Sequence, residues 1–133
     1  MAMNHPKYPT PERELPGSVY IPDLDDWAPD DRDVLAALLA HMQSYRCPVC
    51  GEPLYDLTDI HEAIVTKGDV QSWPDSWKFL IFNLFNCIVV HRRCHKHGNR
   101  QHWWDYKCVI FGREEMSRWY YSLPFKTEIR KFN

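Results

Sequence analysis

The sequence predicts an α+β fold with one small domain, and three patterns carry that prediction. Two short apolar runs, around residues 57–64 and 87–90, have the composition of a pair of strands. Helical patterns come before and after this pair. Two closely spaced pairs of cysteine and histidine, at 47–50 and 91–94, bracket it. With 133 residues, of which 44% are hydrophobic, the chain has room for one small core that a bound metal would help to stabilise.

The elements before the strands are an arm and a helix. Residues 1–30 contain six of the ten prolines, which predicts an extended, non-helical arm over a domain formed by residues 31–133. From Asp30 a helix is expected to run to about Tyr45, with Asp30 or Asp31 as its cap. Its apolar residues recur at helical spacing and predict a core-facing stripe: Val34, Leu35, Leu38, Leu39 and Met42.

The elements after the first strand follow from turn residues. A turn is expected at 67–69, and the tryptophan-rich stretch 70–85 is expected to be a packed loop that includes a helical turn. The pattern of residues 91–97 predicts a short helix that ends at Gly98. Asn99 can cap a helix that reaches Phe111, and a last helix is predicted over residues 113–123.

The cysteine and histidine spacing predicts a structural zinc site. Cys47 and Cys50 offer two thiolates on one tight turn, and His91 and Cys94 offer a second pair about forty residues later. Such a four-ligand site stabilises the fold without taking part in chemistry. A single C-x-x-C is also a redox motif, but no thioredoxin-like pattern surrounds this one. Two further cysteines stand in apolar runs and are expected to be buried free thiols: Cys87 and Cys108.

On the strength of these residues, the chain resembles the HNH endonuclease family, also called ββα-metal or His-Me finger nucleases, and especially its small, zinc-containing phage members. The second half of that family's motif has an asparagine, zinc ligands five and eight residues later, and a histidine or asparagine at nine. This chain has Asn86, His91, Cys94 and His95 at those offsets, after the first-strand His61. The resemblance covers roughly residues 45–98. It implies a ββα-metal core that also holds a catalytic Mn²⁺, Ni²⁺, Mg²⁺ or Zn²⁺.

The resemblance implies roles for the site residues, and two alignments remain open. In the first, which keeps apolar residues on both sides of the polar pair and is slightly preferred, His61 binds the catalytic ion and Glu62 stands where the general base belongs. In the second, His61 is the base and Asp59 supplies the contact to the ion. His95 is a ligand of that ion in both. Asn86 would pin a loop or orient the base.

Charge is divided unevenly along the chain. Residues 1–60 hold four Lys and Arg against eleven Asp and Glu, a net −7, whereas residues 61–133 hold twelve against seven, a net +5. This fits a polyanion-binding half beside an acidic cover. Four basic residues around the proposed site are expected to contact DNA phosphates: Arg92, Arg93, Lys96 and Arg100.

The expected function is that of a metal-dependent DNA endonuclease that nicks or cuts both strands. Two alternatives remain: a zinc-containing DNA-binding module whose catalytic site has decayed, as Glu62 in place of a histidine suggests, or an interaction protein that keeps only the zinc site. His61 and His95 favour the enzyme, because a zinc site needs neither. We further expect a cytoplasmic protein, in a bacterial host if phage-encoded, with DNA and phage packaging proteins as partners, no membrane segment and a monomer as one option.

Overall fold

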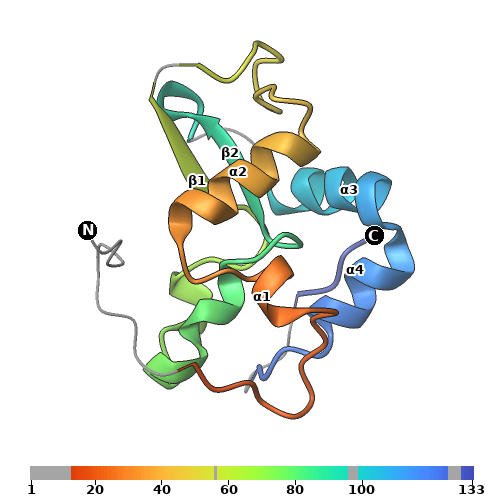
Figure 1. Ribbon diagram of the computed structural model, residues 1–133. Helices are drawn as coiled ribbons and strands as arrows, with labels where there is room; N and C mark the ends of the chain where they lie inside the picture. Colours follow the sequence, from red (N-terminus) through yellow and green to blue (C-terminus); the bar gives the residue numbers. More distant parts are fainter. Residues whose placement is uncertain (1–12, 56, 96–98, 126–129) are drawn as a thin grey trace, which may run out of the picture.

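The computed structural model describes residues 13–55, 57–95, 99–125 and 130–133, and it has the expected α+β composition (Figure 1). Its sheet has two antiparallel strands, β1 (Thr58–Glu62) and β2 (Cys87–His91). The helices are α1 (Leu24–Trp27), α2 (Arg32–Met42), α3 (Arg100–Phe111) and α4 (Arg113–Tyr120), and the 3₁₀ helices are η1 (Gly68–Val70), η2 (Asp75–Ile81) and η3 (Arg92–Cys94).

The two faces of the sheet have different neighbours. The register pairs Ile60 with Val89, and both side chains pack with the buried leucines of α2, Leu35 and Leu39. On the other face, Ile88 and Val90 belong to the larger core, which includes residues of α3 and α4. Because side chains alternate along a strand, Asp59 and His61 project toward this second face, next to their strand partners Val90 and Ile88.

Helix α2 forms with the predicted cap but ends at Met42 rather than near Tyr45, and Val34 of the predicted core-facing stripe is exposed. The side chain of Asp31 accepts hydrogen bonds from the first backbone N–H groups of the helix. The helix ends at Met42 because Ser44 and Tyr45 turn to positive φ values of 54° and 58°. Just past the helix, the buried amide of Gln43 makes two 2.8 Å hydrogen bonds with the backbone of Val89, one to its carbonyl oxygen and one from its N–H.

In the described part of residues 1–30, the expectation of a non-helical arm fails at residues 24–27, whereas residues 13–23 contain no helix or strand. Residues 24–27 form α1 because Asp23, directly after Pro22, caps this turn. The segment also enters the core: the ring of Trp27 stacks on Phe85 with centroids 4.6 Å apart. Its packing makes it part of the domain rather than a cover.

The packed loop between the strands contains η1 and η2. Its centre is Phe85, which is fully buried and lies 5.5 Å from the ring of Trp119 in α4. Two buried asparagines organise its end. The side chain of Asn83 accepts hydrogen bonds from the backbone N–H groups of Phe85 and Asn86, so the chain enters β2 in a fixed direction.

The helix predicted for residues 91–97 is wrong at its start. His91 has an extended backbone (ψ 144°) and ends β2, and a 3₁₀ turn, η3, follows it. Residues 96–98 lie outside the described part of the chain, so Gly98 as the stop is not tested. Further on, Asn99 caps α3 as predicted, and Gly112, at φ 91°, separates α3 from α4. Helix α4 ends at Tyr120, three residues before the predicted end.

The other expectations concern cysteines and membranes. Cys87 is fully buried, as expected for a structural thiol, whereas Cys108 is only half-buried. In the described segments, every helix is too short or too polar to pass through a lipid bilayer.

Lys107 of α3 is an unexpected buried cation, 1% exposed. Its Nζ donates a hydrogen bond to the carbonyl oxygen of Leu84 (2.7 Å) and lies 5.6 Å from the ring centre of Phe111. Burial lowers the pKa of Lys107 to about 7. The folded chain therefore holds this proton less tightly than an unfolded chain, in which a lysine has a pKa of roughly 10.4.

We predict that Lys107→Met stabilises the protein at pH 7 by on the order of 1–3 kcal/mol and that this advantage shrinks towards pH 10. The unfolded chain binds the extra proton between pH 7 and about 10, so the native protein gains stability over that range while the variant lacks this gain. Urea unfolding at several pH values measures the difference. Lys67→Met, at an exposed side chain, is the control. If the difference in unfolding free energy between Lys107→Met and the native protein did not change with pH, the prediction would be contradicted.

Candidate functional site

Cys47, Cys50, His91 and Cys94 come together as the spacing predicts. One ligand atom from each lies within 4.8 Å of all the others, close enough for one metal ion. A tetrahedral zinc with Zn–S bonds of about 2.3 Å places its sulfurs roughly 3.8 Å apart, so the set fits zinc after small adjustments. Three of the four side chains are buried and Cys50 is exposed.

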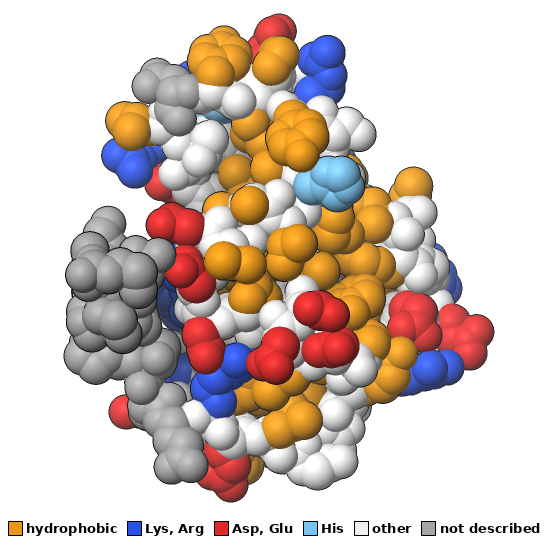
Figure 2. Space-filling view, viewed as in Figure 1, with side chains coloured by type: hydrophobic (Ala, Val, Ile, Leu, Met, Phe, Trp, Pro, Cys, Tyr) orange, Lys and Arg blue, Asp and Glu red, His pale blue; other side chains and the backbone are white. Residues whose placement is uncertain are grey.

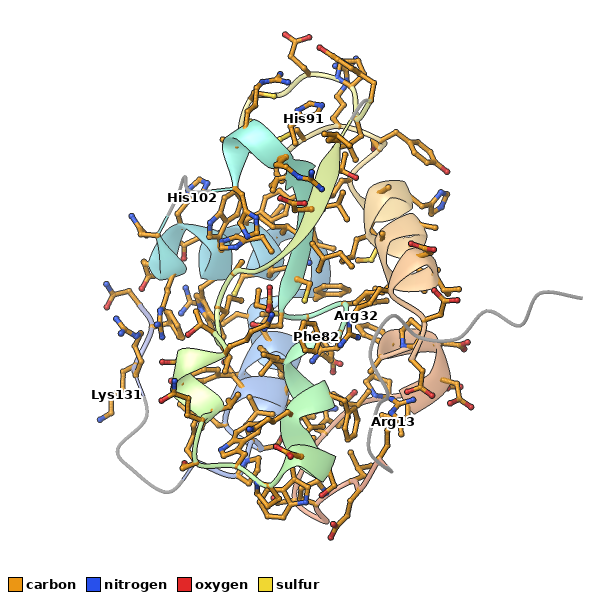
Figure 3. All side chains as sticks on the ribbon, turned by 90° about the vertical axis from the view of Figure 1, so that its left-hand side faces the viewer. Arg13, Arg32, Phe82, His91, His102 and Lys131 are labelled. Carbon is orange, nitrogen blue, oxygen red and sulfur yellow. The ribbon has the colours of Figure 1, made fainter. Side chains whose placement is uncertain are left out.

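The histidine of this cluster is oriented by a hydrogen bond. His91 Nε2 lies 2.9 Å from the carbonyl oxygen of Pro53, which can only accept. The proton of a neutral ring therefore sits on Nε2, and Nδ1 is left free as the ligand atom. Nδ1 lies 3.3 Å from Sγ of Cys50. Figure 3 shows His91 beside the end of β2 and η3. At metal sites, a histidine commonly binds the ion through one ring nitrogen while the other ring nitrogen donates to a carbonyl oxygen.

The turn that carries Cys47 and Cys50 is built by its backbone. The N–H of Gly51 donates to the carbonyl oxygen of Cys47 (2.8 Å), and the N–H of Cys47 donates to that of Glu52 (2.9 Å). Gly51 has φ 77°, a conformation that favours glycine. Although burial raises the pKa of Cys47, backbone N–H groups around its sulfur lower it to about 6. Burial and the two neighbouring thiols raise the pKa of Cys94 to about 11.

Directly beside this cluster, Asp59, His61 and His95 form a second group. Asp59 Oδ2 lies 3.1 Å from His95 Nδ1, and its Oδ1 accepts a 3.2 Å hydrogen bond from Nε of Arg92. The rings of His61 and His95 meet edge to face with centroids 4.8 Å apart. Burial and the charge of His95 lower the pKa of His61. Burial raises the pKa of Asp59, but its hydrogen bonds with His95 and Arg92 outweigh this and lower it.

Glu62 lies on the other face of β1. Its register partner is Cys87, which packs with α2, and its carboxylate oxygen is 3.9 Å from Nζ of Lys67. Its charge acts on Arg32 at the start of α2. A general base must lie within hydrogen-bond reach of the water that it activates. The strand alternation therefore separates Glu62 from the group formed by Asp59, His61 and His95.

Asn86 pins two loops. Its Nδ2 donates to the carbonyl oxygens of Val65 and Ile81, both at 2.8 Å, and its Oδ1 accepts from the N–H groups of Ile64 and Val65. The residue is fully buried. Among the hydrogen bonds of the described residues, none joins Asn86 to His61. These contacts fit the first of the two roles expected for Asn86, that of pinning a loop.

The basic residues expected to meet DNA have different surroundings. Arg92 pairs with Asp59, and Nη2 of Arg93 lies 3.9 Å from Sγ of Cys50. Arg100, at the start of α3, forms an ion pair with Asp69 at 2.7 Å. Lys96 lies outside the described residues. The first two therefore flank the site residues, and Arg100 lies on a different element.

Sequence reasoning missed a pocket beside His61. A cavity of about 710 Å³ is lined by His61 and Glu62 of β1, by the first residues of α3, and by residues 130–132. Arg130 and Lys131 gave no sequence signal, because they stand far along the chain from the motif. Residues 130–133 contact α3, and this contact brings Arg130 and Lys131 to the pocket.

The comparisons with known proteins add no family assignment: no protein-family model, curated protein or solved structure matches this chain.

We predict one zinc ion per chain, held by the Cys47 cluster, and loss of both metal and folding in Cys94→Ser, because a buried ligand of a closed site cannot be replaced by solvent. Elemental analysis and circular dichroism measure the two effects. Cys108→Ser, at a half-buried cysteine outside the cluster, should keep its zinc and its fold. A folded, zinc-free Cys94→Ser protein would show that the cluster is not a structural metal site.

Proposed function

We propose that this chain is a metal-dependent DNA endonuclease of the HNH type. The observation that carries the proposal is the group formed by Asp59, His61 and His95, drawn together from β1 and from the turn after β2. A zinc site alone requires none of these residues. Their position directly beside the Cys47 cluster matches what the motif resemblance implies.

The strand alternation favours the second of the two alignments. Asp59 and His61 share one face of β1 with His95 close by, whereas Glu62 faces α2. We therefore assign the general base to His61 and the contacts to the catalytic ion to Asp59 and His95. In the described residues, only the Cys47 cluster has three or more donors already close enough for one ion, so Asp59 and His95 would need phosphate and water oxygens to complete the coordination.

The residues suit hydrolysis of a phosphodiester. His61 accepts a proton from the attacking water as the water oxygen bonds to phosphorus and the bond from phosphorus to O3′ breaks; the leaving oxygen takes a proton from solvent. A bound divalent ion would stabilise the charge that develops on the phosphoryl and leaving oxygens. Arg92, exposed and next to Asp59, can contact a phosphate oxygen.

We predict that the protein cuts supercoiled plasmid only with an added divalent ion, and that manganese or nickel serves at least as well as magnesium, because an imidazole is among the ligands. Gel electrophoresis of plasmid incubated with each ion measures this. A brief treatment with dilute EDTA should stop cutting before the buried zinc leaves. Plasmid binding without cleavage under every ion would indicate the decayed DNA-binding module instead.

We predict that His61→Ala lowers the cleavage rate by about 10²–10⁴-fold at every concentration of the activating ion, because it removes proton transfer and not metal binding. Asp59→Asn should instead weaken binding of that ion, so that added ion restores part of the rate. Glu62→Gln is the matched carboxylate control and should remain close to the native rate.

Two outcomes would contradict these roles. A Glu62→Gln protein as slow as His61→Ala would return the base role to Glu62, as the first alignment has it. Full activity in both His61→Ala and His95→Ala would show that these residues do not form an HNH active site.

A further inference from the structure

The pocket beside His61 is built from three separate segments. β1 supplies His61, the start of α3 supplies Arg100 and Trp103, and residues 130–132 supply Arg130, Lys131 and Phe132. Its volume of about 710 Å³ falls within the roughly 300–1,000 Å³ that is usual for sites of small ligands. A single nucleotide fits such a space.

Residues 130–133 are held against α3 by specific contacts. The ring of Phe132 stacks on Trp104 with centroids 4.6 Å apart and planes 7° apart. The backbone N–H of Asn133 donates to Oε1 of Gln101 (3.1 Å), and Nε2 of Gln101 lies 3.3 Å from the carbonyl oxygen of Asn133. Figure 3 shows Lys131 on the same side of the molecule as His102 of α3. The segment thus forms one wall of the pocket.

Among the charged residues that line the pocket, three are basic and one is acidic, and two further lining residues are aromatic, Trp103 and Phe132. The basic lining residues are Arg100, which pairs with Asp69, and Arg130 and Lys131; the acidic one is Glu62. Arg130 and Lys131 are exposed, and within the described chain neither has an ion-pair partner. Trp103 is 2% exposed, and its indole N–H, a donor only, has no hydrogen-bond partner among the described residues. The exposed side chains of Arg130 and Lys131 suit a phosphate, because both carry a positive charge and N–H donors.

The acidic side chains gather elsewhere. Figure 2 shows a group of them on the face that carries α1 and the start of α2, where Asp23, Asp25, Asp26, Asp31 and Asp33 lie. A nucleic-acid strand is repelled by that face and attracted by the basic pocket. The pocket adjoins His61, so a strand that enters it also passes the proposed catalytic group.

We propose that this pocket holds the nucleotide next to the scissile phosphate of a DNA strand, and that Arg130 and Lys131 contact the phosphate on its far side. The inference rests on the proposed function, because it places the reacting phosphate at His61. It makes residues 130–133 part of the substrate site. Arg130 and Lys131 position the strand and take no part in the chemical step.

The test compares the double variant Arg130→Gln/Lys131→Gln with Lys78→Gln/Arg113→Gln, which removes the same two charges at positions that do not line the pocket. Binding of a fluorescein-labelled DNA duplex is measured by anisotropy without added divalent ion, between about 50 and 200 mM salt. The pocket variant should bind roughly tenfold or more weakly near 100 mM salt, with a salt slope reduced by about 0.9 for each phosphate that the variant no longer neutralises. The control should show less than half of this weakening.

Cleavage supplies the second readout. With bis(p-nitrophenyl) phosphate, a diester that has no flanking nucleotide, both variants should react at the native rate. With the DNA duplex, the pocket variant should show a raised KM and a nearly unchanged kcat. Equal DNA affinity and equal salt slopes in the two double variants would overturn the pocket assignment, even if the native chain cleaves DNA. If the native chain binds DNA through this pocket but cleaves neither substrate, the proposed endonuclease function fails, and with it the placement of the reacting phosphate.

Discussion

The Cys47 cluster joins the turn before β1 to the end of β2, and the candidate site depends on this junction. β1 and β2 are five residues each, and an isolated hairpin of that size is at best marginally stable in water. The cluster ties the turn at 47–50 to the end of β2 and to η3. Since His95 directly follows Cys94, the ligands that fix the hairpin also fix the position of His95 opposite Asp59. A metal ion bound by these four residues would therefore also set the geometry of Asp59, His61 and His95.

Buried side-chain amides complete this framework where regular structure ends. Asn86 uses both its amide nitrogen and its oxygen on the loops around residues 64–65 and 81, so the chain leaves β1 and enters β2 at set points. Asn83 orders the approach to β2. An unpaired amide in such a position costs more than an apolar residue, so these networks specify one loop arrangement rather than simply adding stability. The long loop between the strands is anchored at both of its ends by these amides.

The sequence could predict features that depend on residues close together along the chain, and it could not predict features that depend on tertiary contacts. The cap at Asp31, the cap at Asn99 and the spacing of Cys47 to Cys50 are local, and each predicted a correct element or cluster. α1 was missed because the prolines around it outweighed a single capping aspartate. The choice between His61 and Glu62 depends on which face of β1 packs on α2, and that follows from tertiary contacts. The burial of Lys107 and the return of residues 130–133 to the site are equally nonlocal.

Gln43 has an effect that reaches beyond the single chain. β2 pairs with β1 along one of its edges, and the amide of Gln43 binds both backbone groups of Val89 as a neighbouring strand would. An exposed edge of a buried apolar strand such as Cys87–His91 is a template on which another copy could add a strand and begin to aggregate. A two-stranded sheet has two outer edges, one on β1 and one on β2. The uncharged side chain of Gln43, just after α2, blocks the edge of β2, the more apolar strand. The short hairpin is thereby protected from edge-to-edge pairing at that strand without a third strand.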